Sequence, residues 1–144
     1  MEHASRVLQR ALLDWRDADP FAILGTHWSS YDETIAEAHR RMRERMLLDR
    51  ARESSDATLR DMARKVSARL DEARDAVATR AGREKVRAGL VDPSKRGVAA
   101  QLCGDQAKLA EFQADLARAR DAWRRVLELY PGTASAEAAL ARLR

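Results

Sequence analysis

The fold is decided by two stretches of this 144-residue chain, DETIAEAHRRMRERMLL at residues 32–48 and SDATLRDMARKVSARLDEARDAVATR at residues 55–80. In both stretches apolar side chains recur every three or four positions, which is the period of a helix with one buried face. The faces are Ile35, Ala38, Met42 and Met46 in the first, and Leu59, Met62, Val66, Leu70, Ala73 and Val77 in the second. These matching seams predict an antiparallel hairpin in which Ile35 and Met42 pack against Val66 and Leu70.

The rest of the chain also favours helices. Ala, Leu, Arg and Glu dominate, whereas Gly occurs only six times and Pro three times. No stretch alternates apolar and polar residues with the Val, Ile or Thr enrichment of a strand. We therefore predict an all-α fold. The further helices are expected at 2–17, 21–24, 83–90, 105–130 and 135–144.

Breaks between these patterns predict four segments. An N-terminal helix occupies 1–18, and a helical unit that contains the hairpin occupies 19–91. A linker is expected at 92–104, which contains Pro93 and two glycines. A helical hairpin is expected at 105–144, because residues 109–130 carry an apolar stripe at spacings that alternate between three and four. That stripe is expected to pack against 135–144 or the first helix, with a homodimer through it as the alternative.

Charge and cysteine content narrow the class of protein. The net charge is +4, with 27 basic and 23 acidic residues interspersed, so nucleic-acid binding is the weaker interpretation. The single cysteine, Cys103, excludes an intrachain disulfide and suits a cytoplasmic protein. No apolar run approaches the length of a membrane span, and no membrane partner is expected.

The residues that could carry chemistry form no recognisable site. His3, His27 and His39 lack metal-ligand spacing to a cysteine or an acidic cluster. The sequence contains no glycine-rich phosphate loop and no nucleophile motif. We expect no catalytic residue, no metal and no cofactor, and therefore a protein that is not an enzyme.

Residues 19–90 resemble the J-domain family of co-chaperones, named after DnaJ. Residues 21–25 (FAILG) are similar to its opening aromatic-x-hydrophobic-Leu-Gly motif, and 32–42 to its second helix. Residues 70–77 (LDEARDAV) are similar to its third helix, and Arg83 and Val86 fall where its fourth helix carries a basic and an aromatic residue. The resemblance covers about half of the chain and implies a short helix, a hairpin and a short fourth helix.

The chain departs from this family at its signature. J-domains carry His-Pro-Asp directly after the second helix, and the gap-free fit places Leu47, Leu48 and Asp49 there. In the family that tripeptide is needed to stimulate the ATPase of a DnaK-type chaperone. The resemblance therefore implies a helical scaffold without that activity. Without the proline, the helix is also expected to continue for another turn.

The C-terminal part is similar to a single tetratricopeptide-like helix pair, through Ala119, Trp123, Leu127, Tyr130 and Pro131. One such repeat does not normally bury its own apolar face, because these units stack on neighbours. The resemblance implies that this face packs on another part of the chain or on a second molecule.

These observations predict a protein-interaction adaptor. Its partner-binding surface is expected to be the basic side of 32–48 and the turn that follows: Arg40, Arg41, Arg43, Arg45, Leu47, Leu48 and Asp49. The predicted partner is a DnaK-type chaperone or another acidic protein. The alternatives are a working co-chaperone of a DnaK-type ATPase and a basic nucleic-acid binder.

Overall fold

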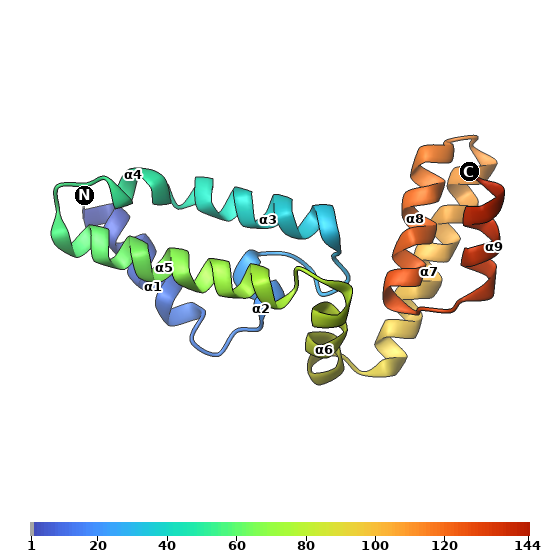
Figure 1. Cartoon of the computed structure of the whole chain (residues 1–144), viewed down its shortest axis with the longest axis horizontal. Coiled ribbons are helices and arrows are strands. Elements are labelled where there is room, and N and C mark those ends of the chain that lie inside the picture. Colours follow the sequence, from blue (N-terminus) through green and yellow to red (C-terminus); the bar gives the residue numbers. More distant parts are fainter. Residues whose placement is uncertain (1) are drawn as a thin grey trace. The chain divides into compact units, whose positions relative to one another are not determined.

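The structure is a computed structural model that describes residues 2–144, so Met1 of the predicted N-terminal segment lies outside the described residues. Over those residues the chain forms nine helices and no strand, which confirms the all-α prediction (Figure 1). The chain divides into two compact units, Met1–Arg87 and Ala88–Arg144, and the boundary falls within the helix Arg80–Leu90. Each unit is described separately below.

The first unit is organised around one long helix, α5 (Ala57–Ala76). The helices that pack against it are α1 (Glu2–Asp14), α2 (Pro20–Leu24), α3 (Asp32–Arg45) and α4 (Leu48–Arg52). A sixth helix, α6 (Arg80–Leu90), follows α5. Leu8, Phe21, Ile35, Val66 and Leu70 belong to the shared core, and Met42 packs against it. The N-terminal helix, predicted at 2–17, ends at Asp14 and is part of this unit.

The predicted hairpin is present, with α3 and α5 side by side and in opposite directions (Figure 1). His39 Nε2 lies 2.8 Å from Asp71 Oδ1, and Arg43 Nη1 donates to Ser67 Oγ at 3.4 Å. One helical turn forward on α3 thus corresponds to one turn backward on α5, which defines an antiparallel pair. These polar contacts flank the apolar seam on which the hairpin was predicted.

The end of α3 differs from the prediction of a helix that covers 32–48 and continues for another turn. Helix α3 ends at Arg45, Leu47 adopts a left-handed φ of 51°, and α4 then begins at Leu48. A left-handed leucine costs about 1–2 kcal/mol. The turn places Leu48, which is fully buried, in the core. Burying a leucine contributes about 1.5–3 kcal/mol, so the core offsets the strained turn.

Two buried arginines hold α6 against the preceding structure. Arg87 donates from Nε to the Trp28 carbonyl and from Nη2 to the Ser30 carbonyl, both at 2.7 Å. Its guanidinium also lies over the Phe21 ring, 5.5 Å from the centroid. Arg83 donates to the Val77 carbonyl at 3.1 Å. Helix α6 begins at Arg80, three residues earlier than predicted.

The second unit corrects two predictions. The expected linker 92–104 is wrong, because α7 (Pro93–Phe112) is continuous through it. Asp92 Oδ1 accepts from the Ser94 amide at 2.9 Å, and proline is favoured at the first position of a helix. The expected helix 105–130 is also wrong, because the chain turns at Ala114, whose φ is 59°. Helix α8 (Leu116–Leu129) then returns antiparallel to α7, and α9 (Ala134–Arg142) packs on α8.

The predicted stripe over 109–130 is therefore not one surface. Ala119, Trp123 and Val126 are buried against α7, whereas Leu109, Phe112, Leu116 and Tyr130 are exposed. The buried face of α7 is made of small residues, Ala100, Cys103, Gly104, Ala107 and Ala110. Trp123 Nε1 donates to Glu111 Oε2 at 3.1 Å, which fixes the two helices near the turn. Because α7 takes part, the C-terminal unit is a three-helix arrangement and not the hairpin predicted for 105–144.

Candidate protein-docking groove

The predicted basic side of α3 is largely neutralised on its outer face. Arg40 forms ion pairs with Glu37 at 2.5 Å and Glu44 at 2.8 Å, and Arg41 contacts Glu37 at 3.0 Å. The hydrogen bond from Arg40 holds the pKa of the Glu37 carboxyl below its ordinary value. Exposed ion pairs of this kind contribute little to stability, because water and salt screen them. This face is a solvated ladder of charges with little positive excess.

Arg43 lies apart from that ladder. Its side chain is only 20% exposed and turns toward α5 and the turn after α3, where Nη2 lies 2.8 Å from Asp49 Oδ1. Arg43 and Asp49 together therefore form a structural contact. They are not two neighbouring members of an open binding face.

The two predicted leucines separate as well. Leu47 is 56% exposed, whereas Leu48 has no exposed surface. Both were predicted to bind a partner, and this is wrong for Leu48, because its side chain is buried in the core. The left-handed turn exposes one leucine and buries the other, because successive residues at a sharp turn face in different directions.

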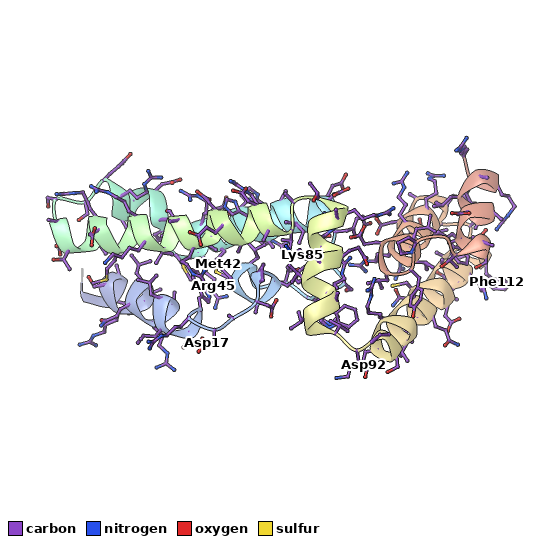
Figure 2. The ribbon with its side chains drawn as sticks, turned by 60° about the horizontal axis from the view of Figure 1, so that its bottom comes forward. Asp17, Met42, Arg45, Lys85, Asp92 and Phe112 are labelled. Carbon is purple, nitrogen blue, oxygen red and sulfur yellow. The ribbon has the colours of Figure 1, made fainter. Side chains whose placement is uncertain are left out.

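Arg45, the last predicted arginine, lines a hollow between α1 and the end of α3. This hollow has a volume of about 550 Å³, and its apolar lining is Val7, Ala11, Trp15, Met42 and Met46. Its charged rim is Arg6, Arg10, Asp14 and Arg45. Figure 2 shows Met42 and Arg45 at this edge of the first unit, beside α1.

A second hollow, of about 500 Å³, lies on the other side of Met46. It is bounded by Ala4 of α1, by Leu47, Arg50 and Ala51 at the turn and α4, and by Ser54, Ser55 and Leu59 before and within α5. Met46 lines both hollows, so the two hollows are adjacent. We name the surface made of the residues that line the two hollows the Met46 groove.

The groove combines an apolar floor with a positive rim. Met42 and Met46 pack on the core while remaining partly exposed. Arg10 pairs with Asp14 at 3.2 Å. Arg45 and Arg50 have no carboxylate partner among the side chains that the structure describes. Methionine is flexible and polarisable and adapts to varied apolar side chains. The rim favours carboxylates, because its charge is not compensated within the chain.

Sequence reasoning missed half of this surface. The N-terminal helix was predicted over 2–17 with no part in partner binding. Leu8 faces the core, whereas Val7 is exposed and lines the groove together with the buried Trp15. The sequence signal was the width of the apolar face of α1. That face is wider than packing against one neighbouring helix requires.

Over residues 2–144, no group of His, Cys, Asp and Glu side chains has the arrangement of a metal site. Within the same range, no helix is long and apolar enough to cross a membrane. Burial raises the pKa of the Cys103 thiol, so this side chain is protonated at neutral pH and is a weak nucleophile.

Comparison with known proteins finds no matching family model, no similar curated protein and no similar solved structure.

Proposed function

We propose that this protein is a non-catalytic adaptor that binds an acidic, amphipathic helical segment of a partner protein in the Met46 groove. The observation that carries the proposal is the combination, at the end of α3, of partly exposed methionines with two arginines, Arg45 and Arg50, that lack carboxylate partners among the described side chains. The proposed binding surface is at the C-terminal end of α3 and not on the outer face of that helix.

The chemistry of the groove matches this class of partner. A helix bound in a groove uses apolar anchors spaced three and four residues apart, and the two hollows that meet at Met46 offer two adjacent places for such anchors. Carboxylates beside the anchors would meet Arg45 and Arg50. Their contribution is mainly to steer the encounter and to select the partner.

A designed peptide tests the proposal with the full chain. The probe is a fluorescent helix of about 15 residues with leucines on one face and glutamates beside them. Arg45→Gln/Arg50→Gln should weaken binding about tenfold, the loss expected for about 1.4 kcal/mol of contacts. Met46→Asp should abolish it, because a carboxylate would replace the apolar floor.

The matched control is Arg40→Gln/Arg41→Gln, which removes the same charge from the same region. Both double variants reduce the long-range attraction of the acidic peptide by the same charge. A difference between their dissociation constants therefore reports direct contact of the peptide with Arg45 and Arg50. We expect the control to change the dissociation constant by no more than about twofold. Equal weakening by both pairs, or no binding of the peptide up to about 1 mM, would refute docking in the groove.

A competing function, stimulation of a DnaK-type ATPase, is favoured by the antiparallel hairpin of α3 and α5. The adaptor proposal predicts no change in the ATPase rate of such a chaperone when the full chain is added. A several-fold stimulation that is lost in Asp49→Ala would establish the co-chaperone function instead. Retention on duplex DNA with a steep salt dependence would favour the nucleic-acid alternative. The proposal places the protein in the cytoplasm, as its single cysteine suggests.

A further inference from the structure

The second unit presents an apolar surface unrelated to the Met46 groove. Helix α7 carries small buried residues on the face toward α8, and large apolar residues on the opposite face: Val98, Leu102, Leu109 and Phe112. Phe112 is 89% exposed, and Leu102 and Leu109 are 58% and 56% exposed. Figure 2 shows Phe112 at the outer edge of this unit. A helix with apolar residues on opposite faces is typical of one buried on both sides.

These four side chains form one line along the helix. Their separations of four, seven and three residues keep them within one face, and Asp105 occupies the gap in the middle. Leu116, also exposed, follows the turn at the end of this line. The adjoining positions Gln101, Gln106 and Gln113 are exposed and uncharged, whereas Asp105 and Lys108 are the charged residues at the middle of the line.

The exposed area is sufficient for a pair of molecules. The four side chains of the line together expose roughly 500 Å² in each copy, because Phe112 is almost fully exposed, and this is at the upper end of the patches found on monomers. Two such surfaces would bury about 1,000 Å² in total, near the lower limit for a specific interface.

We propose that a second copy of this chain covers this surface, with α7 of one copy antiparallel to α7 of the other. Leu102 of each copy would then lie opposite the partner's Phe112, and Asp105 beside the partner's Lys108. Asp105 and Lys108 are exposed and have no ion-pair partner among the side chains that the structure describes. Because a two-fold axis relates the two copies, the Asp105–Lys108 ion pair would form twice, and both side chains of each copy would be paired. A parallel arrangement would instead bring the two copies of Asp105 together, which is repulsive.

The charge pair makes the test specific for self-association. In sedimentation equilibrium of the full chain, we expect a reversible dimer. Asp105→Lys and Lys108→Asp should each weaken it at least about tenfold, because four like charges would meet at the axis. The double variant Asp105→Lys/Lys108→Asp should restore it, because the pairing is then reversed. A heterologous partner would not respond in this way.

Replacing exposed apolar residues by glutamate provides a second test of the dimer. Phe112→Glu should weaken the dimer by about 100-fold or more, because the change occurs twice in the interface and Phe112 contributes little to the fold of its own unit. The matched control is Leu13→Glu on α1, where the side chain is 60% exposed and the dimer should be unaffected. A wild-type chain that stays monomeric at high concentration overturns the proposal.

Disulfide trapping tests the antiparallel direction. In a Cys103→Ala background, Leu102→Cys/Phe112→Cys should give a covalent dimer on oxidation. An intrachain bond is excluded, because residues 102 and 112 are about 15 Å apart along one helix and a disulfide needs Cα atoms within about 7 Å. Leu102→Cys alone should remain uncrosslinked. Efficient crosslinking of that single variant would indicate a parallel pair and refute the proposed arrangement.

Discussion

Nη2 of Arg87 donates a 2.7 Å hydrogen bond to the carbonyl oxygen of Ser30, a residue 57 positions earlier in the chain. Both residues are buried. This contact attaches α6 to the loop before α3, and it determines how the N-terminal end of the hairpin is held. The Met46 groove lies at the other end of α3.

Arg87→Met should lower the free energy of unfolding of the first unit by about 3 kcal/mol or more. The substitution leaves the Trp28 and Ser30 carbonyls without their charged donor, and hydrogen bonds to charged groups contribute about 1.5–3 kcal/mol each. Urea denaturation followed by circular dichroism measures the loss. Arg64→Met, at an exposed position of α5, is the control and should change stability by less than about 0.5 kcal/mol. Similar values for the two variants would show that the buried contacts contribute little.

The two neighbouring leucines after α3 should respond very differently to truncation. Leu48→Ala should cost about 2–5 kcal/mol of unfolding free energy, because it opens a cavity beneath α4. Leu47→Ala should cost less than about 1 kcal/mol, because that side chain is mostly exposed. Thermal and urea unfolding of the two variants provide the comparison. Equal losses would contradict the turn at Leu47.

Ala114→Gly should stabilise the second unit by about 0.5–1 kcal/mol. The φ of 59° at Ala114 is a left-handed conformation that an alanine adopts at a cost and a glycine adopts freely. The matched control is Ala138→Gly, which makes the same change at an exposed position inside α9 and should destabilise by about 1 kcal/mol. Hydrogen exchange of the α8 and α9 amides measures the stability change in each variant. Destabilisation by Ala114→Gly would refute the left-handed turn between α7 and α8.

The second unit should lose stability in acid through Glu111. Its carboxylate lies 2.5 Å from Arg142 Nη1 and accepts from Trp123 Nε1, and the bond with Arg142 is the main reason that its pKa is below the ordinary value of 4.5. A carboxyl whose pKa is lower in the folded state stabilises the fold at pH above 4.5. That contribution is lost as the pH falls below this value and passes through the folded-state pKa.

Glu111→Gln should remove this part of the acid sensitivity while keeping an acceptor for Trp123. The measurement is the Trp123 fluorescence transition in urea between about pH 6 and pH 3, in a background where Trp15 and Trp28 are phenylalanine. The wild-type midpoint should fall more steeply with acid than that of the variant. Parallel pH profiles would exclude Glu111 as a source of the acid sensitivity.

Local sequence was sufficient for the helical class and for the hairpin. The three- and four-residue spacing of Ile35 and Met42, and of Val66 and Leu70, defines one face on each helix whatever surrounds them. Of the residues predicted to bind a partner, Arg45 and Leu47 line the groove, and their role in binding stays a prediction. Periodicity reports which face of a helix is apolar, because that depends only on residues a few positions apart.

Tertiary packing determined the features that local sequence patterns did not predict. Pro93, Gly97 and Gly104 read as a linker, yet they lie in α7, where the proline suits the first turn and Gly104 faces the Trp123 ring. Leu47 ends α3 because Leu48 has a place in the core. The charge of Arg87 is buried because carbonyl oxygens 57 and 59 positions away accept hydrogen bonds from it. In each case the favourable contact comes from residues distant in the chain. Its free energy outweighs the local preference, and only the assembled tertiary structure supplies it.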